Sequence, residues 1–567
     1  MITEVQTGIH PNNQVPELFG YNLYTSDPIL RAALARAGAS WGDAQLLRQG
    51  AEYGSEAALR MGEDAEVYAP ELRTHSPTGE RIDFVKFHPA WHEAMAMARR
   101  NGITNRPYID TRASAWTVYG ASLYMHSQIE PGSCCPSVMT KASIPVLQRN
   151  PALLHDLWPK LADTVHDPRD IPLTHKRSIT VGMGLTEKQG GSDLRSNVTR
   201  AERVGHAGPW GDEFLITGHK WFLSAPMCDA HLVLAQTEAG TLSCFYVPRW
   251  QPDGRKNAIH LQRLKDKVGN RSNSSSEAEF HSAWGVMVGE PGRGIPILVE
   301  MAAYTRLDNV LASAGFIRRA FAQALHYARH RYAFGKALVD QPSMTELLAD
   351  IALETQGATL LGMDLAARFG TSDPLDAAWR RLITPAAKFW VCKRAVTVVA
   401  EAMEVFGGNG YVEIGAMGRL FREAPVSSIW EGAGNVMCLD VLRAVARDPE
   451  GTARVLDWLD AATAGEARVR AQVRRVREAL QRPAAEQERQ ARCTAQRLAL
   501  CAQAALLLKH GSATIAQAFI ASRFDPDWGA LVGVRSGSSH PATLLRESWI
   551  EDAAGQATAA ETIQQTA

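Results

Sequence analysis

The spacing of apolar residues divides this chain of 567 residues into helical and extended stretches. Residues 44–162 and 295–446 carry apolar side chains at helical spacing. Between them, residues 214–217, 232–235 and 244–247 are short apolar or β-branched runs punctuated by glycine and proline, which is typical of strands. Because the strands do not alternate with long helices, a small antiparallel barrel or sandwich is favoured over a Rossmann sheet. The pattern predicts a mainly α-helical protein with a β-barrel insert.

These patterns divide the chain into five predicted segments: an N-terminal arm (1–40), a helical domain (41–178), a β-barrel domain (179–290), a helical bundle (291–446) and an extra C-terminal helical domain (447–567). Pro28, Pro342 and Pro374 are expected to mark helix starts or breaks, and Pro483 is expected to start a helix that runs to His510. The arm either packs on a neighbouring subunit or docks loosely. The tail from Ala553, rich in Ala, Gln and Thr, is expected to be disordered.

Composition excludes several classes of protein. Lys+Arg and Asp+Glu are both 60, so bulk charge gives no argument for nucleic acid or membrane, and any basic patch must be local. The eight cysteines form no C-x-x-C pair, which favours buried free thiols in a reducing compartment over a metal site. No run approaches the ~20 apolar residues of a membrane span, and the N-terminus lacks a secretory signal. A cytoplasmic protein is expected.

Two polar motifs stand out within the predicted β domain. Residues 183–193 (MGLTEKQGGSD) follow an apolar run and combine glycines with hydroxyl side chains, which lets a ligand approach the backbone. Residues 218–224 (GHKWFLS) come about thirty positions later. Taken alone, the first is a tight surface loop and the second a strand with core aromatics.

Together these stretches resemble the flavin-binding strands of the acyl-CoA dehydrogenase family. The resemblance covers roughly residues 85–443, and residues 264–273 (LKDKVGNRSN) resemble its AidB-like branch, the proteins of the bacterial alkylation response. The resemblance implies FAD as cofactor, an acyl-CoA substrate and a homo-oligomer, most simply a tetramer.

The resemblance also assigns candidate cofactor residues in three groups. The flavin-ring group is Met183, Leu185, Thr186, Gly191, Ser192, Phe222, Leu223 and Ser224. The group that a neighbouring subunit supplies in the family is Arg331, Phe334, Gln341, Glu404, Gly407 and Gly408. The group around the predicted catalytic loop is Trp430, Gly432 and Asn435.

Glu431, in an aromatic-Glu-Gly loop, is the candidate catalytic base. In the family this carboxylate removes the substrate α-proton, and an apolar setting raises its basicity. Some members place their base on the helix before an arginine, but the corresponding residue here is Thr305, which cannot take a proton. Arg306 is the substrate candidate near the acyl-CoA channel. The alternatives are a solvated loop carboxylate for Glu431 and a salt-bridged arginine for Arg306.

The extra C-terminal segment carries a local basic excess. Residues 451–510 hold ten Arg and one Lys against six Asp and Glu. AidB-like proteins bind double-stranded DNA through this added domain, so the candidate DNA residues are Arg443, Arg447, Arg470, Arg474 and Arg477. The alternative is a solvated helix face. Two functions therefore stay open: an AidB-type flavoprotein of the alkylation response that binds duplex DNA with weak acyl-CoA dehydrogenase activity, and a metabolic acyl-CoA dehydrogenase with no DNA role.

Overall fold

The computed structural model describes the chain except residues 1–12, 526–527, 529–530, 533–540 and 551–567. The start of the predicted arm and the tail from Ala553 lie outside the described residues. The chain forms two compact units, which we name by their main content. The β unit contains residues 60–111 and 130–308, and the helical unit contains residues 1–59, 112–129 and 309–567.

The β unit combines helices with a seven-stranded sheet. Its helices are α4 (Pro89–Arg100), α5 (Arg106–Ile109), α7 (Cys134–Leu147) and α8 (Pro151–Ala162), after α3 (Glu56–Val67), which begins in the other unit. The strands of the sheet are β3 (Val181–Gly184), β4 (Arg200–Gly208), β5 (Gly211–Ser224), β6 (Ala230–Gln236), β7 (Leu242–Pro248), β8 (Ile259–Leu264) and β9 (Ser275–Met287).

The predicted barrel is confirmed by the strand pairings. The strands pair in the order β3-β6-β4-β5-β9-β7, and β7 pairs again with β6, so the ring of pairings from β6 to β7 closes. Most pairs are antiparallel, whereas β3 runs parallel to β6, with Val181 beside Ala230. Closure removes exposed strand edges, and β6 and β7 are almost wholly buried.

The prediction that residues 44–162 are helical throughout is wrong at one place. Strands β1 (Glu71–His75) and β2 (Arg81–Lys86) form an antiparallel hairpin. Its turn contains Gly79 at φ +87°, a left-handed conformation that glycine adopts without strain. In β2 the burial alternates from Asp83 to Lys86, the period of a strand. The two units also cut across the predicted 41–178 domain, because α2 (Asp43–Tyr53) and α6 (Ala115–Ser127) belong to the helical unit.

The helical unit is built around long helices. They are α1 (Pro28–Arg36), α2 (Asp43–Tyr53), α6 (Ala115–Ser127), α9 (Gly294–His330, which begins in the β unit), α10 (Pro342–Phe369), α11 (Pro374–Val405), α12 (Ala416–Ser427) and α13 (Gly434–Arg447). Pro28, Pro342 and Pro374 each stand in the first turn of a helix, as expected. Proline fits there because its missing N–H would have no partner within the helix.

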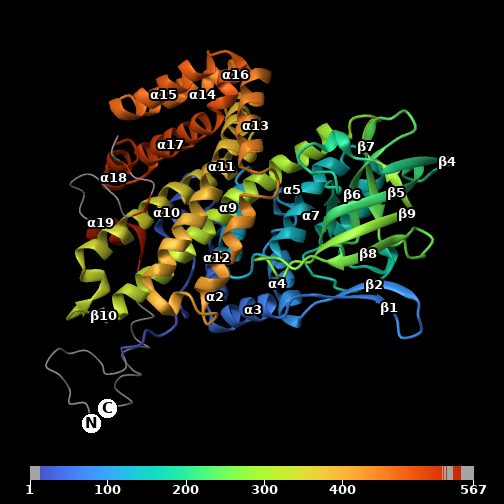
Figure 1. The fold of residues 1–567 in the computed structure, drawn as a ribbon, viewed down its shortest axis with the longest axis horizontal. Helices are drawn as coiled ribbons and strands as arrows, with labels where there is room; N and C mark the ends of the chain where they lie inside the picture. Colours follow the sequence, from blue (N-terminus) through green and yellow to red (C-terminus); the bar gives the residue numbers. More distant parts are fainter. Residues whose placement is uncertain (1–12, 526–527, 529–530, 533–540, 551–567) are drawn as a thin grey trace, which may run out of the picture. The chain divides into compact units, whose positions relative to one another are not determined.

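The C-terminal segment packs on the bundle helices and does not stand apart as a separate unit. It contains α14 (Pro449–Ala462), α15 (Ala467–Leu480), α16 (Ala484–Arg489), α17 (Ala491–His510), α18 (Ala513–Arg523) and α19 (Pro541–Ser548). Helix α17 contacts α10, α11, α13, α14 and α15, and Figure 1 shows α14, α15 and α17 as neighbours. The single helix predicted from Pro483 to His510 is wrong, because it breaks at Gln490.

Within the described ranges, no helix has both the length and the apolar composition needed to cross a membrane.

Candidate functional site

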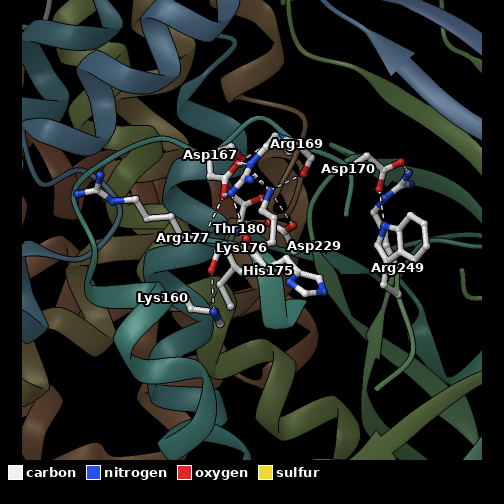
Figure 2. A network of polar contacts seen from close by, with 12 residues as sticks. Lys160, Asp167, Arg169, Asp170, His175, Lys176, Arg177, Thr180, Asp229 and Arg249 are labelled. Atoms are coloured by element: carbon white, nitrogen blue, oxygen red, sulfur yellow. Dashed lines mark hydrogen bonds and ion pairs between the residues drawn. The ribbon is translucent and has the colours of Figure 1, made fainter. Parts of the chain in front are cut away.

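A network of buried charges fixes the start of β3, which leads into the first motif (Figure 2). Lys176 Nζ lies 3.1 Å from a carboxylate oxygen of Asp229 and donates to the Asp167 carbonyl oxygen at 2.7 Å. Asp229 in turn accepts from the backbone N–H of Thr180 at 2.8 Å. Burial raises the pKa of Asp229 against the lowering effect of Lys176. These contacts hold the chain at Thr180, the residue before β3, so the start of the strand has a defined position.

The two motif stretches lie side by side. The backbone N–H of Trp221 donates to the Thr186 carbonyl oxygen at 2.8 Å, and Thr186 forms a bridge pair with Phe222. Gly191 packs on Thr186 so closely that a Cβ there would lie 2.4 Å from the threonine Oγ1. A Cβ at this position would displace the Thr186 side chain. The glycine therefore lets the loop fold back against the strand that precedes it.

A buried ion pair joins the two stretches, and reasoning from sequence had given it no role. Lys220 Nζ lies 2.6 Å from Glu187 Oε1, and both side chains are at most 1% exposed. Glu187 also accepts from the Thr199 hydroxyl at 2.6 Å. Burial opposes ionisation of Glu187, but Lys220 and these hydrogen bonds outweigh it and lower its pKa. Burial lowers the pKa of Lys220 to about 8, although Glu187 acts in the opposite direction.

The flavin-ring candidates differ in what they present. Phe222 is 47% exposed, Ser192 is exposed, and Thr186 and Ser224 are half-buried, so these side chains are open to a ligand. The Leu223 side chain is fully buried. It faces the core, and Leu223 can meet a cofactor only through its backbone. An exposed aromatic beside hydroxyl groups fits a flavin, whose ring needs an apolar surface and polar contacts at its edge.

A second feature that the motifs did not indicate is a cation beside these aromatics. Lys265 Nζ lies 3.6 Å from the Trp221 ring centroid and 4.6 Å from that of Phe222. Glu277 accepts from Lys265 at 2.6 Å and holds it there. Sequence spacing carries no signal for this arrangement, because Lys265 arrives from the loop after β8.

In the helical unit, the segment after α9 forms a two-stranded hairpin, β10 (Tyr332–Ala333) and β11 (Lys336–Ala337). Phe334 at its tip is 98% exposed and has φ +51°. Arg331 donates through Nη1 to the Asn13 carbonyl oxygen, and Gln341 donates to the Ala333 carbonyl oxygen at 2.9 Å. Gln341 therefore stabilises the hairpin, and the Phe334 side chain projects from its tip into solvent.

The Gly-Gly-Asn-Gly turn (Gly407–Gly410) lies against the C-terminal end of α9. Asn409 donates to the Tyr327 hydroxyl oxygen at 3.0 Å, and the Tyr327 ring centroid lies 4.3 Å from that of Phe406. A Cβ at Gly407 or Gly408 would meet nothing within 4 Å, so both face open space. Glu404 is exposed. The Arg331 segment and this turn are thus both attached to the last turns of α9.

Glu431 lies in a tight loop between α12 and α13 with φ +57°, in the left-handed region. Trp430 before it donates through its indole N–H to Asn309 Oδ1. Lys388 on α11 donates to the carbonyl oxygens of Trp430 and Gly432, at 2.7 and 2.5 Å. The loop is therefore held on both sides of the carboxylate.

The neighbours of this loop include the C-terminal segment. Arg492 at the start of α17 donates to Asn435 Oδ1 at 2.8 Å. Thr305 and Arg306 belong to α9 within the β unit and are 2% and 9% exposed. Thr305 donates its hydroxyl to the Ala302 carbonyl oxygen at 3.2 Å, which suits a structural role.

The candidate DNA residues do not share one environment. Arg443 and Arg447 are exposed on α13, and Arg470 and Arg474 are exposed on α15. Arg477, by contrast, lies 2.7 Å from Asp457 and 2.9 Å from Asp460 on α14. Val469, Val473 and Val476 of α15 are buried, so Arg470 and Arg474 lie off the packed face.

Comparison with known proteins agrees with this arrangement. Residues 13–168 match the adaptive response protein AidB N-terminal domain, residues 182–283 the acyl-CoA dehydrogenase middle domain, and residues 292–446 the acyl-CoA dehydrogenase C-terminal domain.

Individual relatives match over most of the chain. It is 44% identical over 525 residues to the putative acyl-CoA dehydrogenase AidB of Escherichia coli, covering 91% of this chain and 94% of that protein. It is 31% identical to acyl-CoA dehydrogenase family member 11 of Caenorhabditis elegans, covering 75% of this chain and 70% of that protein. The crystal structure of C. elegans ACDH-11 in complex with C11-CoA has a TM-score of 0.81 at 26% identity, covering 94% of this chain and 92% of that one. The chain therefore belongs to the acyl-CoA dehydrogenase family of oxidoreductases, and within it to the AidB type.

Proposed function

We propose that this protein is an FAD-dependent acyl-CoA dehydrogenase-type enzyme in which Glu431 removes the α-proton of an acyl-CoA thioester. The observation that carries the proposal is the constrained loop at Glu431, where Lys388 holds the backbone before and after the residue that bears the carboxylate. A base that keeps one position needs no reorganisation when the proton is transferred. The ACDH-11 structure with C11-CoA supports an acyl-CoA as the substrate class.

The proposed cofactor residues have defined tasks. Thr186 and Ser224 offer hydroxyls, and the open backbone at Gly190 allows close approach of a phosphate or ring edge. Phe222 offers an exposed aromatic surface. Arg331, Phe334, Gln341 and the Gly407–Gly408 turn would serve the FAD of a partner subunit. A flavin bound beside Thr186, Phe222 and Ser224 would accept the hydride that leaves the β-carbon of the acyl-CoA.

The chain's own chemical step is proton removal. The Glu431 carboxylate takes the proton from Cα, which the thioester carbonyl acidifies, and the electron pair left on Cα forms the Cα–Cβ double bond as the hydride departs from Cβ. The product is the 2,3-enoyl thioester. The Trp430 indole, tied to Asn309, keeps an apolar group beside the carboxylate and limits its hydration.

The test is anaerobic mixing of the purified flavoprotein with saturated acyl-CoA thioesters of several chain lengths. The flavin absorbance of the wild type should bleach, whereas Glu431→Gln should retain FAD and bleach at least about 10³-fold more slowly. Glu413→Gln, an exposed carboxylate on the segment before α12, is the matched control and should behave as wild type. Equal bleaching rates in wild type and Glu431→Gln would remove Glu431 from the mechanism.

A second candidate function rests on α15. Its exposed arginines Arg470 and Arg474, with Arg443 and Arg447 on α13, offer sequence-independent contacts to phosphates. Together with the match of residues 13–168 to the adaptive response protein AidB N-terminal domain, these arginines support the proposal of a DNA-binding flavoprotein of the alkylation response, in which acyl-CoA turnover is slight. Arg477 contributes least to this proposal, because two aspartates already neutralise it.

A further inference from the structure

The loop that carries Glu431 contains an unusual backbone conformation. Glu431 has φ +57°, and Gly432 follows at φ +104°. A side chain with a Cβ rarely adopts the left-handed region, because Cβ then approaches the neighbouring carbonyl oxygen. The loop keeps this conformation only if the surroundings impose it.

Lys388 contacts this loop from α11. Its side chain is 1% exposed, and it rises from the middle of α11, a helix of 32 residues. Its ammonium group donates to the carbonyl oxygens of the residue before and the residue after Glu431, at 2.7 and 2.5 Å. The peptide units before residue 431 and after residue 432 are thereby fastened to a single nitrogen, and both positive φ angles lie between them. This arrangement restricts rotation of the backbone of the two residues.

The chemistry of the contact suits a clamp. An ammonium has three N–H donors that can turn to meet separate acceptors, and charge-assisted hydrogen bonds are the stronger ones. Burying an ammonium is costly unless such bonds satisfy it, so its presence at a loop beside the proposed base needs an explanation. A neutral apolar side chain of the same length would pack in the helix without this cost but would leave both carbonyl oxygens without their donor.

We propose that Lys388 is the positioning residue of this enzyme's base: it holds the backbone at Glu431 in the left-handed conformation and so sets the direction of the carboxylate. The inference rests on the proposed role of Glu431. Lys388 acts on the loop and not on the substrate, so it governs the rate of proton removal and not the affinity for the thioester. Loss of the clamp lets Glu431 relax to a negative φ, which turns its Cα–Cβ bond away from the present direction.

The test compares Lys388→Met with Lys393→Met. Lys393 is a matched control, because it lies on the same helix with its Cε near Gly434, the first residue of α13. Among the described residues, Lys393 donates no hydrogen bond to a carbonyl oxygen of the loop. We expect Lys388→Met to lower the limiting rate of flavin reduction by at least about 10²-fold, with an acyl-CoA dissociation constant within a factor of three of wild type. Lys393→Met should match wild type in both quantities.

A readout independent of turnover is hydrogen exchange of the amides of residues 430–434. Exchange in Lys388→Met should rise at this loop while the rest of α11 stays protected, whereas a general packing role would loosen α11 as a whole. Unchanged exchange and an unchanged rate would overturn the inference. If Lys388→Met does not fold, Lys388→Gln takes its place. The glutamine amide is a neutral donor and is one bond shorter, so exchange at the loop should be faster than in wild type. Exchange equal to wild type would equally overturn the inference.

A double-variant cycle separates this inference from the proposed function. On the Glu431→Gln background, Lys388→Met should cause little further loss, because both act on one group. A full additional loss would show that Lys388 acts elsewhere. If Glu431→Gln alone leaves the rate unchanged, the proposed function fails. If Glu431→Gln is inactive but Lys388→Met is as fast as wild type, only the clamp fails.

Discussion

Lys220 on β5 and Glu187 in the loop after β3 form an ion pair of 2.6 Å with essentially no exposure to solvent. The pair is the buried link between the two motif stretches, residues 183–193 and 218–224, and Lys220 also donates to the Leu234 carbonyl oxygen on β6 at 2.8 Å. Removing one member of such a pair leaves a buried charge without compensation.

We therefore expect Lys220→Met to lower the free energy of unfolding by about 3–5 kcal/mol, and to lower FAD content as the Thr186 loop loosens. Denaturant unfolding and the absorbance ratio of flavin to protein measure the two effects. Lys188→Met changes an exposed neighbour in the same motif and should leave both unchanged. Adding Glu187→Gln to Lys220→Met should restore much of the stability, and a further loss in the double variant would contradict a charge-based cause.

A second prediction concerns acid stability of the segment before β3. Burial raises the pKa of Asp170, but Arg249 and Lys256, each 2.8 Å away, outweigh it and hold the pKa well below its ordinary value. A carboxyl whose pKa is lowered in the folded state stabilises the fold above its unfolded pKa, near 3.8, and this contribution is lost as pH falls toward the folded pKa.

Asp170→Asn should therefore cost about 3 kcal/mol of stability at pH 7, and the difference from wild type should shrink as pH falls below about 4. Urea unfolding between pH 3 and pH 7 measures it. Asp266→Asn, at a side chain 91% exposed, is the control and should follow the wild-type curve. A difference that stays constant over this range would show that Asp170 acts through packing and not through its charge.

A third prediction tests assembly. Phe334 is 98% exposed at the tip of a hairpin, and Tyr411 and Ile414 are 85% and 83% exposed after the Gly-Gly-Asn-Gly turn. Exposed aromatic and aliphatic side chains of this size mark contact surfaces. Phe334→Asp should shift the mass measured by light scattering toward the monomer and reduce FAD content. Val268→Asp, at an exposed apolar residue of the β unit, should keep the wild-type mass. A wild-type protein that is monomeric and saturated with FAD would contradict the proposed shared site.

The elements that could be predicted from sequence are those with a strong local signal. The proline-started helices at Pro342 and Pro374 and the buried stripe of α15 follow from residue type and spacing alone. The β1–β2 hairpin was missed because its strands are short and half exposed, so their alternation is weak against the helical pattern on either side. The pairing of Thr186 with Phe222 has no local signal, because it joins two separate stretches of the chain.

The residues that sequence reasoning missed act over long separations. Lys388 lies 42 and 44 positions from the carbonyl groups that it binds, and Lys220 lies 33 positions from Glu187. A lysine within a helix or strand pattern is normally interpreted as solvent-exposed, since lysine is seldom fully buried. Only the packing of the chain shows that these two are inside it. The same holds for Arg477, whose neutralisation by Asp457 and Asp460 depends on α14 lying beside α15.

The last prediction separates the two functions by salt dependence. If Arg470 and Arg474 contact phosphates, duplex DNA should bind with little sequence preference, and each lost contact should lower the slope of log affinity against log salt by roughly 0.9. Within the part of the chain that the structure describes, neither arginine forms an ion pair, so replacing both with glutamine should lower the slope by roughly 1.8 without loss of stability or of flavin reduction.

Arg477→Gln instead removes two ion pairs, and it should lower stability while leaving the slope near the wild-type value. Arg73→Gln with Arg200→Gln, at exposed arginines of the β unit for which the described residues show no ion pair, is the matched charge control. A salt slope that falls equally in the control pair would show binding through general charge and not through α15, and a wild type that binds no duplex at low salt would leave the enzyme function alone.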